Sequence, residues 1–195
     1  STQLVNRLGV EIYNAYDSIP DTYYGLSKVM SESIVHSSLN DTSSRYTILR
    51  PTTMWGPGCS EHYLSFLKIL NSGKYFHPTL SKVYKSYGYI ENAVYIIVEL
   101  LLNESLQSGQ TFYLSDYEKI EIYDWICGLC LRMGSSFPIR IPYIISRGIS
   151  SISDQLMAVN ILPRGFPLTT KRINNICTQY TYSTDHIQQL IPSLP

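Results

Sequence analysis

Charged residues are scarce in this chain. They make up 15% of the 195 residues, and 15 Lys/Arg balance 15 Asp/Glu, so the formal net charge is zero. Proteins that bind nucleic acid or an anionic membrane carry an excess of basic residues, which this composition lacks. We therefore expect no nucleic acid and no membrane among its partners. Hydrophobic residues reach 44%, which favours a packed protein of helices and buried strands over a disordered chain.

Long apolar runs and cysteines are also few. The longest apolar run, Ala93 to Leu102, contains Glu99 and is far shorter than the ~20 residues that cross a membrane. We therefore expect a cytoplasmic protein. Among the four cysteines, Cys127 and Cys130 are close in sequence, but they lie in a helical apolar pattern and lack two further ligands at suitable spacing. We interpret them as small buried residues and expect no metal site.

A tyrosine and a lysine lie four residues apart in the segment Tyr24-Gly25-Leu26-Ser27-Lys28. Apolar positions at helical intervals predict a helix from Gly25 to about Leu39, so both side chains project from one helical face. A free phenol titrates near ~10, and a cation beside it favours the phenolate. Such a tyrosine can exchange a proton with an alcohol or a ketone. The spacing also occurs by chance in a chain with 17 tyrosines, so the context of the pair decides.

Hydrophobic periodicity predicts the remaining secondary structure. The order helix, turn, strand recurs, and it is typical of an α/β protein. The further helices predicted are Glu61 to Leu70 (with Leu64, Phe66, Leu67 and Leu70 facing inward), Glu91 to Asn103, Ile122 to Met133, Tyr143 to Leu156 and Asp185 to Leu190. The buried strands predicted are Tyr46 to Leu49 and Thr111 to Leu114.

Three other segments stand in order around the tyrosine and the lysine. Ser1-Thr2 precedes them, and the strand is followed by Arg50-Pro51-Thr52-Thr53-Met54-Trp55-Gly56-Pro57-Gly58. A later segment, Lys85 to Ala93, reads Lys-Ser-Tyr-Gly-Tyr-Ile-Glu-Asn-Ala. Together these segments resemble those of the extended short-chain dehydrogenases/reductases, the NAD-dependent epimerase/dehydratase family of nucleotide-sugar enzymes. The resemblance covers nearly the whole chain.

This resemblance implies an α/β fold, the C-terminal part of a Rossmann-type doubly wound parallel sheet with a small mixed α/β substrate-binding lobe. Residues 1–117 would form the C-terminal portion of the NAD-binding domain with interleaved substrate-binding segments. Residues 118–195 would form mainly the substrate-binding lobe. The family's Gly-x-x-Gly-x-x-Gly turn, which cradles the cofactor pyrophosphate, does not occur in these residues. We therefore expect an N-terminally truncated fragment that is inactive by itself.

The resemblance also implies roles for the residues near the tyrosine. Tyr24 would be the catalytic acid and base, Lys28 would support it and bind the nicotinamide ribose, and Thr2 would orient the reacting oxygen. Tyr23 has a serine rather than a lysine four residues later, so Tyr24 is the better candidate. Pro51 and Thr53, at the strand end, would contact the cofactor, which is NAD or NADP.

Three residues would bind the substrate, which by resemblance is a nucleotide sugar. Thr53 lies where open α/β sheets place ligand contacts. Lys85 stands in place of a family arginine that grips the substrate diphosphate, and a lysine does so only as a point charge. Arg172 is a further phosphate candidate, against the alternative of a solvated surface arginine. The helix that bears Tyr24 has apolar positions that permit a homodimer.

The activity expected is NAD(P)-dependent epimerisation or reduction of a nucleotide sugar. Dehydratases of the family carry an Asp-Glu pair directly after the threonine, where this chain has Gln3-Leu4, and leucine cannot move a proton. Two alternatives remain open: a hydroxysteroid- or flavonoid-type ketone reductase, and a nonenzymatic binding module. The intact Tyr24 and Lys28 argue against a binding module, and the polar, tyrosine-rich second half favours a sugar nucleotide over an apolar ketone.

Overall fold

The computed structural model describes residues 23–40, 43–103, 106–163 and 166–195. These residues form two compact units. The first contains the described chain up to Cys59, Ser86–Lys119 and Thr181–Pro195, and the second contains Ser60–Lys85 and Ile120–Tyr180. The chain therefore passes from one unit to the other four times. One of these crossings, after Lys119, lies close to the boundary predicted after residue 117. The cofactor-binding and substrate-binding roles of these parts remain predictions.

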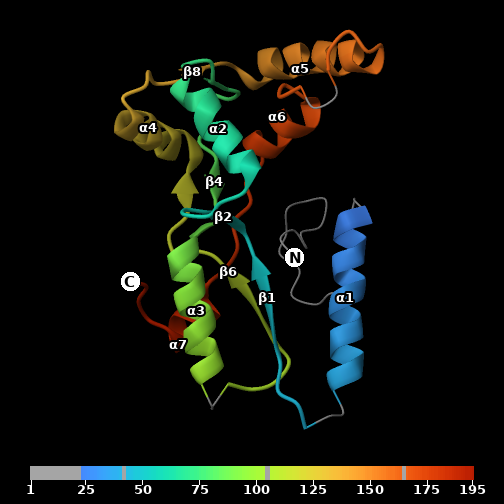
Figure 1. Cartoon of the computed structure of the whole chain (residues 1–195), viewed down its shortest axis with the longest axis vertical. Helices are drawn as coiled ribbons and strands as arrows, with labels where there is room; N and C mark the ends of the chain where they lie inside the picture. The colour runs from blue at the N-terminus through green and yellow to red at the C-terminus, as the bar shows by residue number, and fades with distance from the viewer. Residues whose placement is uncertain (1–22, 41–42, 104–105, 164–165) are drawn as a thin grey trace. The chain divides into compact units, whose positions relative to one another are not determined.

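The first unit is built on parallel strands. Strand β1 (Thr47–Pro51) pairs with β6 (Gln110–Leu114), and β2 (Thr53–Trp55) pairs with β5 (Tyr87–Tyr89). Helix α1 (Tyr23–Leu39) lies along the β1–β6 pair and begins at the end of the unit at which β1 ends (Figure 1). This antiparallel course of helix and strand is what a helix followed by a strand of a parallel sheet requires.

The core of the first unit lies on the opposite side of the β1–β6 pair from α1. Helices α3 (Ile90–Leu102) and α7 (Asp185–Leu190) cover that side (Figure 1). Successive strand residues face opposite sides, so Phe112 and Leu114 enter this core while Tyr113 points toward α1. The buried core residues are Ala93, Ile96, Leu100, Leu106, Phe112, Leu114, Ile187 and Ile191.

The turn after β2 requires a glycine. Gly56 has a φ of 122°, which side-chain-bearing residues rarely adopt. A Cβ atom at this position would lie 2.7 Å from the Tyr89 ring and 2.9 Å from Ile90. The close approach lets Trp55 pack on Tyr89, with ring centroids 4.9 Å apart.

The second unit has short strands and four helices among its described residues. Strand β3 (Phe76–His77) pairs in parallel with β8 (Ile139–Arg140), and β4 (Tyr84–Lys85) pairs antiparallel with β7 (Ile120–Glu121). The helices are α2 (Glu61–Asn71), α4 (Ile122–Met133), α5 (Tyr143–Ala158) and α6 (Thr170–Cys177). Helix α4 has both expected caps: the Glu121 carboxylate accepts the Asp124 N–H at 2.8 Å, and Gly134 ends the helix at a φ of 67°.

Helix α5 turns three of its four serines inward and its isoleucines outward. Ser146, Ser150 and Ser153 are buried, whereas Ile144 and Ile152 are 83% and 60% exposed. The serine face packs against α6, where the Asp154 carboxylate accepts the Thr170 N–H at 3.1 Å. Serine occupies little volume, so the two helices can lie close together.

The predicted α/β class with parallel strand pairing is confirmed, and so are the predicted helices. Strand β1 extends to Pro51, two residues beyond its predicted end, because Arg50 still pairs with Tyr113 of β6. The prediction that Leu64 faces inward is wrong, since its side chain is 47% exposed while Leu70 is 1% exposed. Helix α6 was not predicted. None of the described helices is both long enough and apolar enough to span a membrane.

Candidate functional site

Tyr24 and Lys28 lie together on the first turns of α1. The Lys28 ammonium is 5.4 Å from the centroid of the Tyr24 ring. Tyr24 is 62% exposed, so its phenol is accessible in the described structure, whereas Lys28 is half-buried. Among the described residues, Lys28 makes this ring contact and no hydrogen bond through its ammonium. Within the described part of the chain, its N–H donors are therefore available for a ligand.

A buried ion pair fixes α1 to β1 one turn beyond Lys28. Arg50 Nη2 lies 2.7 Å from Glu32 Oε2, and Arg50 Nε donates to Glu32 Oε1 at 3.1 Å. Both residues are buried, at 1% and 6% exposure. Burial by itself lowers the pKa of Arg50. The hydrogen bond that Arg50 donates to Glu32, the charge of Glu32 and the interactions with Tyr113 together outweigh burial and raise that pKa above its ordinary value. Sequence reasoning missed this pair, although Tyr24, Lys28 and Glu32 are spaced at i, i+4 and i+8 on one helical face.

The arginine extends the contact to β6. Arg50 Nη1 donates to the Tyr113 hydroxyl at 3.2 Å, and the guanidinium carbon lies 5.4 Å from the Tyr113 ring centroid. The Tyr113 ring in turn stacks on Tyr182, with centroids 4.3 Å apart. The helix that carries Tyr24 is therefore connected to both strands of the parallel pair by buried polar contacts.

The cofactor candidates Pro51 and Thr53 lie at the carboxyl end of β1, the end at which α1 begins (Figure 1). Thr53 is exposed. Its neighbour Thr52 is buried, and the Thr52 hydroxyl donates a hydrogen bond to the Leu114 carbonyl at 3.1 Å. Ligands of open α/β sheets bind outside the carboxyl ends of the strands, and Thr53 lies just beyond such an end. Its role as a ligand contact remains a prediction. Thr2 lies outside the described residues.

The second unit contains a pocket of about 690 Å³ between α2, β3 and α6. Its walls are mainly apolar or aromatic, and they include Phe66, Ile69, Tyr75, Phe76, Ile173 and Ile176. Three basic residues, His62, Lys74 and Arg172, also line it, and no acidic residue does within the described chain. Size and lining of this kind are typical of a ligand site. The predicted substrate residue Arg172 thus borders a pocket.

The other predicted substrate residue of this unit, Lys85, is buried. It is 4% exposed, and its ammonium donates to the Asn175 carbonyl at 2.6 Å. The Tyr180 ring centroid lies 4.8 Å from the same nitrogen. Burial lowers the pKa of Lys85 to about 8, and the nearby Cys177 opposes this shift. The residues that line the 690 Å³ pocket do not include Lys85.

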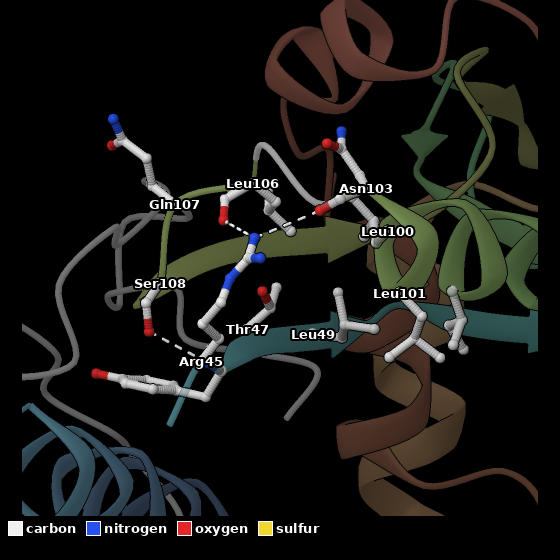
Figure 2. Close-up of a pocket in the computed structure, with 11 residues that line it drawn as sticks. Arg45, Thr47, Leu49, Leu100, Leu101, Asn103, Leu106, Gln107 and Ser108 are labelled. Carbon is white, nitrogen blue, oxygen red and sulfur yellow. Dashed lines mark hydrogen bonds between the residues drawn. The ribbon is translucent and has the colours of Figure 1, made fainter. Parts of the chain in front are cut away.

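A second pocket, of about 500 Å³, lies at the amino end of β1 in the first unit. Figure 2 shows Leu49, Leu100 and Leu101 on its wall and the Arg45 guanidinium aimed at the carbonyls of Leu106 and Asn103. None of the predicted site residues that the structure describes lines it. It lies at the opposite end of the strand from Pro51 and Thr53.

Comparison with known proteins gives concordant results. The model of the 3-beta hydroxysteroid dehydrogenase/isomerase family matches residues 8–138. A UDP-glucose 4-epimerase of Vibrio cholerae is 25% identical over 115 residues, which are 58% of this chain and 35% of that protein.

Solved structures show the same fold at low identity. The UDP-glucuronic acid 4-epimerase of Bacillus cereus in complex with NAD superposes with a TM-score of 0.55 at 18% identity, over 90% of this chain and 57% of that one. RMD from Pseudomonas aeruginosa complexed with NADPH gives 0.53 at 16% identity, over 71% and 50%. The chain therefore spans between about a third and somewhat over half of the length of these relatives.

Proposed function

The chain belongs to the 3-beta hydroxysteroid dehydrogenase/isomerase family, and on that premise we propose that the intact protein is an NAD(P)-dependent epimerase or reductase of a nucleotide sugar. One observation carries the proposal: Tyr24 presents an accessible phenol with the Lys28 ammonium over its ring, on a helix anchored by a buried ion pair. A binding module has no need of this arrangement. The names of the related proteins, a UDP-glucose 4-epimerase and a UDP-glucuronic acid 4-epimerase, support the substrate class.

The residues near the amino end of α1 and at the carboxyl end of β1 fit the ribose of a nicotinamide cofactor. Lys28 is half-buried and has no hydrogen-bond acceptor within the described part of the chain, so its ammonium can donate to a ribose hydroxyl. Thr53 is exposed at the carboxyl end of β1, with Pro51 beside it. The nicotinamide ring, when bound, accepts or supplies hydride.

The chain's own residues would move the proton. Tyr24 would take it from the sugar hydroxyl that is oxidised and return it when the carbonyl is reduced. The Lys28 ammonium, 5.4 Å from the centroid of the Tyr24 ring, would support this exchange. Glu32 and Arg50 act at a distance, since their ion pair holds α1 and hence the phenol in place. Thr2 is retained as the predicted donor to the reacting oxygen.

The 690 Å³ pocket is proposed to hold the nucleotide part of the substrate. Aromatic side chains such as Phe66 and Tyr75 offer flat apolar surface to a base. Arg172 and Lys74 supply positive charge, and a guanidinium matches a phosphate group with two parallel N–H donors. The predicted phosphate role of Arg172 is therefore part of the proposal.

The test is the substitution Tyr24→Phe in the full-length protein. It should lower kcat by ~10²–10⁴-fold on UDP-glucose or UDP-glucuronic acid, because the proton acceptor is lost while the ring remains. Tyr23→Phe is a matched control, since Tyr23 is 94% exposed and has no lysine one turn later. Conversion is measured by chromatography of the sugar nucleotides. A Tyr24→Phe enzyme as active as the Tyr23→Phe enzyme would refute the assignment.

A second candidate is a ketone reductase for an apolar substrate. The family model carries the name of hydroxysteroid enzymes, and the walls of the 690 Å³ pocket are mainly apolar. The full-length protein decides between the two when it is given a hydroxysteroid and a UDP-sugar in parallel, with nicotinamide absorbance as the readout. Turnover of the steroid alone would replace the sugar-nucleotide proposal.

A further inference from the structure

Lys85 ends β4 with its side chain directed into the second unit. Only 4% of its surface is exposed, and its ammonium donates to the Asn175 carbonyl at 2.6 Å. The ammonium also lies 4.8 Å from the centroid of the Tyr180 ring. Within the described chain these groups, and not solvent, surround the charge.

The carbonyl that Lys85 contacts belongs to the last turn of α6. The final four carbonyls of a helix lack partners within the helix, so a hydrogen-bond donor that reaches one of them is stabilising. The same short helix supplies Arg172, Ile173 and Ile176 to the wall of the 690 Å³ pocket. The lysine therefore acts on one end of a helix whose other turns line the pocket.

We infer that Lys85 is a positioning residue: its ammonium caps the last turn of α6 and so fixes the pocket wall that carries Arg172, without contacting the phosphates of the ligand. This differs from the diphosphate role that the sequence resemblance implies for this position. The inference rests on the proposed function only in that the ligand of the pocket is taken to be a nucleotide.

The charge and the donor function of Lys85 can be separated by pH. Burial lowers the pKa of Lys85 to about 8, so the side chain becomes neutral in an accessible range. A neutral amine still has N–H donors for the Asn175 carbonyl, but it no longer attracts a phosphate by charge. The other titratable groups around it are the Cys177 thiol, whose pKa burial raises, the Tyr180 phenol and, on the paired strand, Glu121.

The first experiment compares Lys85→Met with Lys82→Met in the full-length protein. Lys82 is exposed three residues earlier and provides a matched control. Calorimetric titration with UDP and with uridine should show that Lys85→Met weakens both by the same factor, about tenfold, because the wall moves for either ligand. A loss confined to UDP would overturn the inference, since it would reveal a direct phosphate contact.

A second measurement does not depend on any ligand. Hydrogen exchange of the ligand-free protein should show faster exchange of the α6 amides in Lys85→Met than in Lys82→Met, because the helix has lost its cap. Equal protection of α6 in the two variants would overturn the positioning role. If this arm succeeds while neither UDP nor uridine binds the unmodified protein, the proposed function fails and the positioning role stands.

The third measurement needs no variant. UDP affinity of the unmodified protein should stay constant between pH 7 and pH 9, because Lys85 keeps its donor while it loses its charge. A fall in affinity with a midpoint near pH 8 would overturn the inference.

Discussion

Each unit of the molecule buries a cation, but the partners differ. In the first unit, Arg50 faces the Glu32 carboxylate at 2.7 Å and the Tyr113 hydroxyl at 3.2 Å. In the second unit, Lys85 faces the backbone carbonyl of Asn175 and the ring of Tyr180. Both cations are less than 5% exposed, so the surroundings and not the degree of burial distinguish them.

The pKa values of the two cations shift in opposite directions. The hydrogen bond to Glu32, the charge of Glu32 and the interactions with Tyr113 together outweigh desolvation, so the pKa of Arg50 is raised. The Asn175 carbonyl supplies only a dipole, so desolvation prevails and the pKa of Lys85 falls to about 8. A buried cation with a carboxylate is a permanent charge, whereas one with a carbonyl can be discharged near physiological pH. The first unit thus has an anchor of fixed charge one turn beyond its candidate catalytic pair, and the second has a buried amine that can lose its charge.

The largest effect is expected when the buried ion pair of the first unit loses its arginine. Arg50→Met should lower the free energy of unfolding by about 3–5 kcal/mol, because it leaves the Glu32 carboxylate buried without its partner. Urea unfolding of the full-length protein measures the change. Lys119→Met, at an exposed position of the same unit, should change stability by less than about 0.5 kcal/mol.

The double variant Glu32→Leu, Arg50→Met sharpens the same point. It should regain most of the lost stability, since a buried ion pair can be replaced by apolar residues at little cost. An Arg50→Met protein that is within 1 kcal/mol of the unmodified one would show that Glu32 is not desolvated as described.

A buried histidine, His77, should make the stability of the second unit sensitive to acid. His77 is fully buried, and within the described chain its Nε2 atom has no hydrogen-bond partner. Burial lowers the pKa of His77 from 6.5 to about 4. The charge of Arg140 lowers it further by a smaller amount, and the charge of Glu121 opposes the shift. Between these pH values the unfolded chain takes up a proton that the folded chain refuses. Stability therefore falls as the pH drops through this window, by roughly 3 kcal/mol in full.

The matched variants for this prediction are His77→Gln and His186→Gln. His186 is exposed in the first unit, so its removal should leave the acid sensitivity unchanged. The difference in unfolding free energy between pH 7 and pH 5 should be smaller in His77→Gln than in His186→Gln. Equal differences would argue that His77 titrates normally.

The smallest effect expected concerns one glycine in each unit. Gly56→Ala should destabilise by about 1–3 kcal/mol, because alanine is strained at a φ of 122° and its Cβ meets the Tyr89 ring. Gly148→Ala, in α5 with open space around it, should stabilise by about 0.4–1 kcal/mol. Thermal unfolding of both variants measures the contrast. A stabilising Gly56→Ala would show that the turn can relax.

Much of the fold could be predicted because it depends on short-range periodicity. The apolar intervals that follow Gly25, and those between Ile122 and Met133, predict α1 and α4 to within two residues. Helix α6 escaped because its eight residues contain few apolar positions; its signal was Thr169, whose hydroxyl accepts the Arg172 N–H at 3.2 Å as an N-cap. Leu64 was misplaced because the edge of an amphipathic helix cannot be located without its packing partner.

Some features of the candidate site could likewise be predicted from the sequence, and others could not. The spacing of Tyr24 and Lys28 along one helix determines that they meet, since the helical repeat fixes their separation. The partner of Glu32 could not be predicted, because Arg50 is 18 residues away and only the packing of α1 on β1 brings the two together. For Lys85, the resemblance implied a contact with a phosphate of the substrate. In the structure the Lys85 ammonium is buried and donates to the Asn175 carbonyl.

The sequence by itself determined the helices other than α6, the strands β1 and β6, and the tyrosine–lysine pair, because these follow from regular spacing along a single element. Only the tertiary structure decided which charges are buried, which partners neutralise them and which side chains enclose the 690 Å³ pocket. Those properties depend on contacts between residues far apart in the chain. The free energy of such contacts is set by the packed surroundings and not by the local pattern of residues.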